Sequence, residues 1–215
     1  MIMHKKIIFQ INVPKYGSSD KLTAYTYIED MYKVSEECAR KYAKRCNADY
    51  YKVVVADDFK LSAAKHLDYQ KLKAYDFLEY DQIIYFDSDY IIKDNAPNLF
   101  KVCGDKFSVC QDQGRSVQDL AKELDMPTEK YFNAGFMHFT KNSLIKTKPF
   151  LSEYLTKEYT WDCQGFLNKL YHDKNIEFNM LPAHQWNNHR RVFGEYADHY
   201  SGAKKKKWNV SRYRN

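Results

Sequence analysis

Two carboxylates one residue apart interrupt an apolar stretch of the chain, Ile83-Ile84-Tyr85-Phe86-Asp87-Ser88-Asp89-Tyr90-Ile91-Ile92. Its β-branched and aromatic residues predict a strand that is buried on both faces. In an extended backbone residues two apart point the same way, so Asp87 and Asp89 are expected to face a common point. A divalent cation would relieve their repulsion and leave coordination positions for phosphate oxygens. The alternative is a strand that simply ends in an acidic turn.

The segments around the acidic pair alternate between strand and helix patterns. Before the pair, strands are predicted at 5–11 and 50–55, and helices at 22–46 and 63–78. After it, strands are predicted at 106–110, 131–139 and 176–181, and helices at 117–124, from about 142 and at 162–171. This order predicts an α/β fold with a mostly parallel central sheet and helices on both faces. Ligands of such sheets bind beyond the carboxyl ends of the strands, where the acidic pair falls.

Length and composition narrow the class of protein. A chain of 215 residues with 44% apolar residues is expected to form one domain with a sizeable core. The net charge of +6 suits an anionic partner, such as nucleic acid, an acidic membrane or a phosphorylated small molecule. Five cysteines without C-x-x-C spacing indicate neither a disulfide framework nor a zinc site. With no apolar run long enough for a leader or a membrane span, we expect a soluble cytoplasmic protein.

Several motifs, in a fixed order over about residues 5–209, resemble the GT-A-fold glycosyltransferases of family 8, which include glycogenin and bacterial galactosyltransferases. Asp87-Ser88-Asp89 resembles the metal-binding D-x-D of that family. Lys71-Leu72, sixteen residues upstream, resembles a Lys-Leu pair that helps to hold the sugar and phosphate of the donor. The resemblance implies a single GT-A domain over 1–215, with a nucleotide-binding half (1–92) and a donor-sugar and acceptor half (93–215).

Two further motifs concern the sugar. Phe132-Asn133-Ala134-Gly135 resembles F-N-[SA]-G, in which the Asn reaches toward the sugars. Gln164-Gly165-Phe166-Leu167-Asn168 resembles the end of D-Q-x-x-L-N, but Cys163 stands where the family has its Asp, and Asp162 comes one residue earlier. Because that Asp contacts the donor sugar in the family, the identity of the transferred sugar is left open.

The C-terminal stretch from His199 resembles H-x-x-G-x-x-K-P-W, with one inserted residue and no Pro. In the family the His completes the metal site, and the Gly and Lys close over the diphosphate. Gly202 matches the Gly, and either Lys205 or Lys206 matches the Lys, depending on the end from which the insertion is counted. Two Asp oxygens and one imidazole nitrogen suit Mn²⁺ somewhat better than Mg²⁺.

The resemblance implies a metal-dependent transfer of a sugar from a nucleotide-diphosphate donor to a hydroxyl of a glycan or glycoprotein. We expect the donor to be a UDP-sugar and the transfer to retain the anomeric configuration. The expected metal ligands are Asp87, Asp89 and His199. The expected catalytic residues are Asn133, Asp162 and Gln164. The expected donor-binding residues are Lys71, Asp87, Ser88, Asp89, Ala134, Gly135, Cys163, Gly202, Lys205 and Lys206.

Two other functions remain open at this point. Phe86-Asp87-Ser88-Asp89-Tyr90 partly matches the motif of haloacid-dehalogenase-like phosphatases, although that motif follows the first strand. A catalytically inactive module that binds nucleotide sugars or glycans is the second alternative. Lys204-Lys205-Lys206-Lys207 before Trp208 also has the composition of a nucleic-acid arm, but we expect no nucleic-acid partner. The size of the chain resembles that of compact glycosyltransferases of bacteria and of large DNA viruses that glycosylate capsids. We expect the acceptor to be small or to be recognised by another domain of a longer polypeptide.

Overall fold

The computed structural model describes residues 4–12, 22–54, 68–114, 116–156, 162–187, 193–200 and 213. The strands are β1 (Lys6–Ile11), β2 (Asp49–Val53), β3 (Gln82–Phe86), β4 (Tyr90–Ile92), β5 (Phe107–Gln111), β6 (Phe132–Thr140), β7 (Phe178–Leu181) and β8 (Ala197–His199). The α-helices are α1 (Leu22–Cys46), α3 (Leu99–Cys103), α4 (Val117–Glu123), α5 (Lys141–Thr147), α6 (Leu151–Thr156), α7 (Cys163–Asp173) and α8 (Ala183–Trp186). The 3₁₀ helices among the described residues are η1 (Gln70–Asp76), η2 (Thr128–Lys130) and η3 (Lys148–Phe150).

The central sheet has six strands in the order β2-β1-β3-β6-β5-β7. The pairs β1–β2, β1–β3 and β5–β7 are parallel, whereas β6 is antiparallel to both of its neighbours. Five strands therefore run in one direction and β6 alone runs against them. A small second sheet pairs β4 with β8 in antiparallel register. The predicted α/β fold with a mostly parallel central sheet is confirmed.

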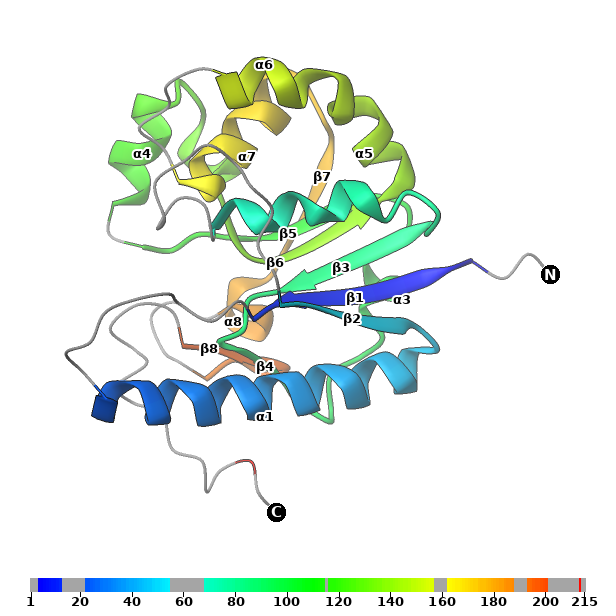
Figure 1. Ribbon diagram of the computed structural model, residues 1–215. Helices are drawn as coiled ribbons and strands as arrows, with labels where there is room; N and C mark the ends of the chain where they lie inside the picture. Colours follow the sequence, from blue (N-terminus) through cyan, green and yellow to red (C-terminus); the bar gives the residue numbers. More distant parts are fainter. Residues whose placement is uncertain are drawn as a thin grey trace.

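Both faces of the central sheet are covered, as Figure 1 shows, with α1 below it and α5, α6 and α7 above it. Alternation along the strands divides the core accordingly. Ile83 and Tyr85 of β3 belong to the cluster that contains residues of α7, and Ile84 and Phe86 belong to the cluster that contains residues of α1. A strand buried on both faces needs apolar side chains at every position, which accounts for the continuous apolar run of β3.

Helix α1 begins and ends at the residues that the sequence predicted. Its buried side chains include Met31, Val34 and Tyr42, which recur at helical spacing and lie on one face. This face packs against β1, β2 and β4. Since β4 follows the acidic pair directly, α1 supports the segment that carries the candidate site.

Two predicted elements were wrong in detail. The expected strand over 83–92 is interrupted: β3 ends at Phe86, and β4 lies in the second sheet. A hydrogen bond from Tyr90 N to Asp87 O (3.0 Å) closes a turn between the two strands, and this turn contains both carboxylates. The helix predicted at 63–78 is described from residue 68, and its residues Gln70–Asp76 form the 3₁₀ helix η1, in which Gln70, Leu72 and Tyr75 are buried.

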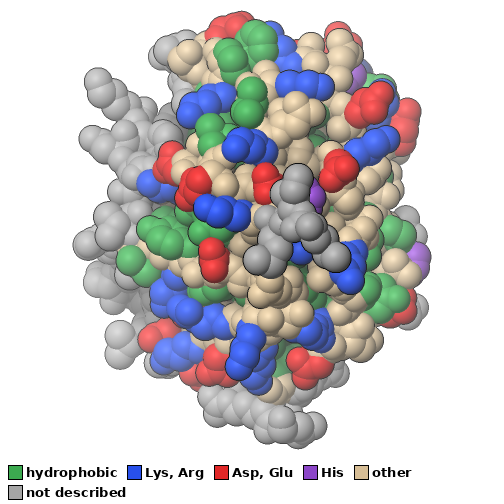
Figure 2. Space-filling model, turned by 90° about the vertical axis from the view of Figure 1, so that its right-hand side faces the viewer, with side chains coloured by type: hydrophobic (Ala, Val, Ile, Leu, Met, Phe, Trp, Pro, Cys, Tyr) green, Lys and Arg blue, Asp and Glu red, His purple; other side chains and the backbone are tan. Residues whose placement is uncertain are grey.

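The side of the molecule on which β1 begins carries numerous Lys and Arg side chains, interspersed with acidic ones (Figure 2). An open groove of about 730 Å³ lies there, and its lining includes Lys5, Lys6, Arg40 and Lys44 together with Asp49 and Glu79. The groove is thus basic but mixed in charge. Among the described helices, none is both long and apolar enough to cross a membrane.

Candidate functional site

The acidic turn lies at the carboxyl end of β3, at the edge of the sheet opposite to the basic groove. In open α/β sheets this is the edge at which ligands bind. Two backbone hydrogen bonds join the turn to distant parts of the chain: Asp87 N donates to Gly135 O (2.8 Å), and Tyr200 N donates to Asp89 O (3.0 Å). The strand β3, the strand β6 and the segment after β8 therefore fix the turn together.

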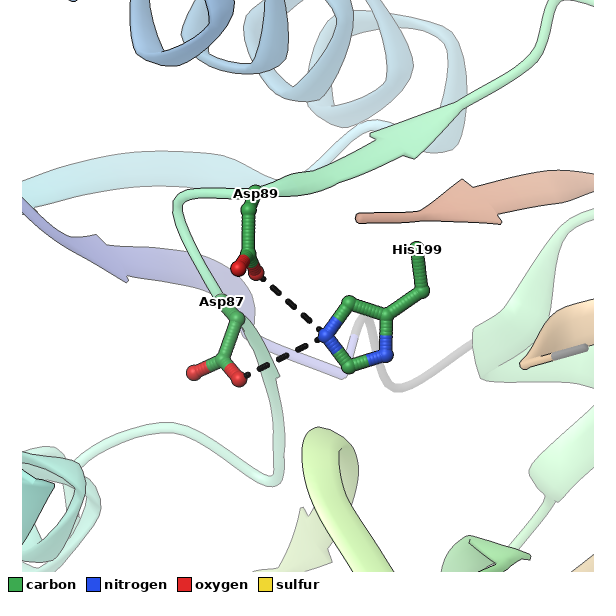
Figure 3. Close-up of side chains that lie close together, drawn as sticks. All are labelled: Asp87, Asp89 and His199. Atoms are coloured by element: carbon green, nitrogen blue, oxygen red, sulfur yellow. Dashed lines mark ion pairs between the residues drawn. The ribbon is translucent and has the colours of Figure 1, made fainter. Parts of the chain in front are cut away.

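Three side chains converge at this turn (Figure 3). One ligand atom each of Asp87, Asp89 and His199 lies within 4.8 Å of the other two. His199 Nε2 lies 3.3 Å from Asp89 Oδ1 and 3.8 Å from Asp87 Oδ2. Asp89 and His199 are buried, whereas the Asp87 side chain is 25% exposed. The site is therefore closed on the protein side and open beside Asp87.

The orientation of His199 is set by Asn187. The imidazole Nδ1 lies 2.6 Å from Asn187 Oδ1, which can only accept a hydrogen bond. With the amide oxygen of Asn187 facing the ring, Nδ1 carries the proton and Nε2 turns its lone pair toward the two carboxylates. Such a hydrogen bond behind the ring is the usual partner of a metal-binding histidine. Asn187 directly follows α8.

Gly135 leaves the space that His199 occupies. A Cβ atom at this position would lie 2.4 Å from His199 Cε1 and 2.9 Å from His199 Nε2. These distances are far below van der Waals contact, so the close approach of the imidazole requires glycine. The Gly of the Asn133-Ala134-Gly135 motif therefore makes room for His199, a candidate metal ligand, and the sequence alone did not reveal this contact.

The donor set fits a divalent ion. Ligand atoms bound to one ion at about 2.1 Å lie roughly 3–4 Å apart, which is the range of the His199–carboxylate separations here. Two carboxylate oxygens and one imidazole nitrogen, with an open side beside Asp87, leave positions for oxygen ligands from a substrate.

Lys71 of η1 joins the same site. Its Nζ lies 3.1 Å from Asp87 Oδ1 and donates to Ala134 O at 3.2 Å. Burial is the largest single influence and lowers the pKa of Lys71, but the neighbouring negative groups, Asp87 foremost among them, together outweigh burial and raise the pKa above its ordinary value. The Tyr85 hydroxyl also donates to Asp87 Oδ1. Lys71 is therefore a fixed cation beside the first carboxylate.

Gln164, on the first turn of α7, joins the Asn133 motif to β5. Its Oε1 accepts from Ala134 N (2.9 Å) and from Asn133 Nδ2 (3.1 Å). Its Nε2 donates to Asp112 Oδ2 (2.8 Å) and lies 3.3 Å from the Tyr131 hydroxyl. Asp112 directly follows β5, as Asp87 follows β3, and these strands run in the same direction. The sequence analysis missed Asp112, although its position directly after a strand, like that of Asp87, could have indicated it.

The remaining predicted residues lie in different surroundings. Asp162 is exposed and caps α7, because its Oδ1 accepts from Gly165 N at 2.9 Å. Cys163 is fully buried in the core cluster, and burial raises the pKa of its thiol. Ser88 lies in the turn between the two carboxylates. Gly202, Lys205 and Lys206 lie outside the described residues.

Comparisons with known proteins identify a matching family and similar folds. A model of glycosyl transferase family 8 matches residues 18–209. A glycosyltransferase involved in the glycosylation of the major capsid of PBCV-1 has a similar structure, with 10% identity, a TM-score of 0.64, and coverage of 95% of this chain and 100% of that chain. Galactosyltransferase LgtC, in complex with donor and acceptor sugar analogues, is 16% identical with a TM-score of 0.53 and coverage of 97% and 93%.

The bifunctional glycosyltransferase WbbM is 16% identical with a TM-score of 0.57, and the match covers 86% of this chain but 40% of WbbM. No curated protein matches the sequence significantly. At these identities the solved structures show the fold, which is GT-A.

Proposed function

The chain belongs to glycosyl transferase family 8, and on that premise we propose that it transfers a sugar from a UDP-linked donor to a hydroxyl of a glycan acceptor, with a divalent ion bound by Asp87, Asp89 and His199. The convergence of these three side chains at the carboxyl end of β3 carries the proposal. The family membership also sets aside the alternative of a haloacid-dehalogenase-like phosphatase.

The chain's own charges suit a diphosphate leaving group. When bound, Mn²⁺ or Mg²⁺ would offset the negative charge that develops on the diphosphate as the glycosidic bond breaks. Lys71 would add a second positive charge, since its ammonium is already held beside Asp87. The mixed oxygen and nitrogen ligands favour Mn²⁺ over Mg²⁺. From the family resemblance we assign Gly202 and either Lys205 or Lys206 to the other side of the diphosphate.

For the transfer itself we propose retention by front-side substitution. The bond from the anomeric carbon to the phosphate oxygen breaks, the acceptor oxygen bonds to the same face of that carbon, and the acceptor's proton moves to the departing phosphate oxygen. Asn133 and Gln164, which hydrogen-bond each other, would orient the sugar. An inverting reaction would instead need a general base, for which exposed Asp162 is the candidate.

The half before residue 93 would bind the nucleotide, and the half after it would bind the donor sugar and the acceptor. The two halves are joined closely, since β4 pairs with β8 and β3 pairs with β6. Ser88, in the Asp87-Ser88-Asp89 motif, and Ala134, in the Asn133-Ala134-Gly135 motif, would contact the donor.

Calorimetric titration with UDP tests the proposal, with GDP as the control nucleotide and with and without Mn²⁺. We expect UDP to bind in a metal-dependent manner and Asp89→Ala to abolish that binding, because the variant removes a buried metal ligand. Absence of binding by either nucleotide in the wild type would refute the proposal. A panel of UDP-sugars, with the anomeric configuration of the product read by NMR, then identifies the donor and distinguishes retention from inversion.

Cys163 gives one reason to keep a second function, a nucleotide-sugar-binding module without catalysis. Its thiol is fully buried in the core, so it does not offer the carboxylate that the family has at this position. Tight metal-dependent UDP binding without transfer or hydrolysis of any UDP-sugar would favour this second function.

A further inference from the structure

A buried network of side chains lies behind the acidic turn, on the side of α1. Gln10, at the end of β1, donates from Nε2 to Ser35 Oγ (2.9 Å) and to Asp87 O (3.3 Å). Ser35, on α1, donates from Oγ to Tyr90 O (2.7 Å). The two side chains therefore hold the carbonyls of the first and last residues of the turn. Gln10 is 2% exposed and Ser35 is fully buried.

The chemistry of the partners fixes the orientation of this network. A backbone carbonyl only accepts hydrogen bonds, so the atom that faces Asp87 O must be the amide nitrogen of Gln10. The amide oxygen then faces the hydroxyl of Tyr50, which donates to it at 2.9 Å. Both hydrogens of the Gln10 amide are used, one for Ser35 and one for Asp87. Neither side chain can rotate without breaking a buried hydrogen bond.

We propose that Gln10 and Ser35 are positioning residues for the metal site, which hold the turn so that Asp87 and Asp89 point at His199. The inference rests on the metal binding proposed above. The turn needs such support because two carboxylates at close range repel each other, and the repulsion acts on a segment of only three residues between β3 and β4. Polar residues that orient metal ligands from behind change metal affinity by about 10- to 100-fold when they are removed.

The role proposed for Gln10 and Ser35 does not require contact with substrate, because both are buried under the turn and hold its carbonyls from behind. Their effect is therefore expected in the geometry of the ligands. A purely structural role would lower the stability of the fold and leave the metal affinity of the folded protein unchanged. Metal affinity and stability must accordingly be measured on the same variants.

The test uses Gln10→Met, which keeps the length of the side chain and removes both donors, and Ser35→Ala. Calorimetric titration with Mn²⁺ in the presence of UDP is expected to show about 10-fold weaker metal binding for each variant. Ser35→Thr keeps the hydroxyl and is expected to retain wild-type affinity even if its added methyl lowers the melting temperature. In the metal-free proteins, hydrogen exchange followed by mass spectrometry is expected to be about 10-fold faster for the Tyr90 amide in Gln10→Met.

Thr147→Val is the matched control. Thr147 is fully buried on α5, and its hydroxyl donates to Ser143 O at 2.8 Å, so its loss removes a buried hydrogen bond on the other side of the sheet. We expect a lower melting temperature and unchanged Mn²⁺ affinity. Wild-type metal affinity in both Gln10→Met and Ser35→Ala would overturn the positioning role alone. A wild-type protein that binds no divalent ion would overturn the proposed metal site, and the positioning role with it.

Discussion

Gly135→Ala is predicted to disrupt the proposed metal site through a single methyl group. The new Cβ would lie 2.4 Å from His199 Cε1, whereas carbon atoms in contact lie about 3.5 Å apart, so the two groups must separate by about 1 Å. His199 cannot yield easily, because it is 2% exposed and Asn187 holds its Nδ1 from behind. The backbone of Gly135 does not have a positive φ, so the effect is steric.

The expected magnitude follows from the tolerance of metal coordination. Ligand distances vary by only about 0.2 Å, so a displacement of about 1 Å removes His199 from the coordination sphere. We expect Mn²⁺ affinity in the presence of UDP to fall by about 100-fold or more. Overpacking should also cost about 2 kcal/mol of the free energy of unfolding and lower Tm by about 6 °C.

Calorimetry and thermal unfolding of the same sample separate the two effects. Gly104→Ala is the control, since Gly104 has a positive φ of 61°. Apart from the chain neighbours of Gly104, no heavy atom of the described residues would lie within 4 Å of a Cβ atom at this position. This variant should lose about 2 kcal/mol to backbone strain, because the ψ of −135° at Gly104 lies outside the left-handed helical region, and it should keep its metal affinity. If Gly135→Ala bound Mn²⁺ as tightly as the wild type, the steric reasoning about His199 would be refuted.

Two further predictions concern stability. Burial lowers the pKa of His138 from 6.5 to about 4, so between these pH values the unfolded chain binds a proton that the folded protein does not. The free energy of unfolding therefore decreases as pH falls from 6.5 toward 4. Urea unfolding should show a loss of about 2 kcal/mol between pH 7 and pH 5, and the His138→Gln variant should lack this loss. Asp198→Asn weakens an ion pair with Lys93 Nζ (3.0 Å) and a hydrogen bond from the Tyr213 hydroxyl. We expect this variant to lower the free energy of unfolding in urea by about 2 kcal/mol. A change below about 0.5 kcal/mol would contradict a stabilising role of Asp198.

The sequence determined the class of fold and the place of the site. Continuous apolar runs at 7–9 and 83–86 need cover on both faces, and an α/β sheet with helices above and below provides it. The acidic pair directly after such a run had to lie at the carboxyl edge of the sheet. The order of Lys71, the acidic pair, Asn133 and Gln164 resembled family 8, whose model matches residues 18–209.

Only the tertiary structure decided how the side chains meet. Alternation predicted that Asp87 and Asp89 share a direction in one strand, but a turn between two sheets brings them together, since the Tyr90–Asp87 hydrogen bond ends β3. The reversed direction of β6 and the burial of Cys163 likewise depend on pairings between distant segments. The approach of His199 to Gly135 joins residues more than sixty positions apart. Local sequence fixes which face a residue prefers, whereas contacts at this separation are fixed by the packing of the whole domain.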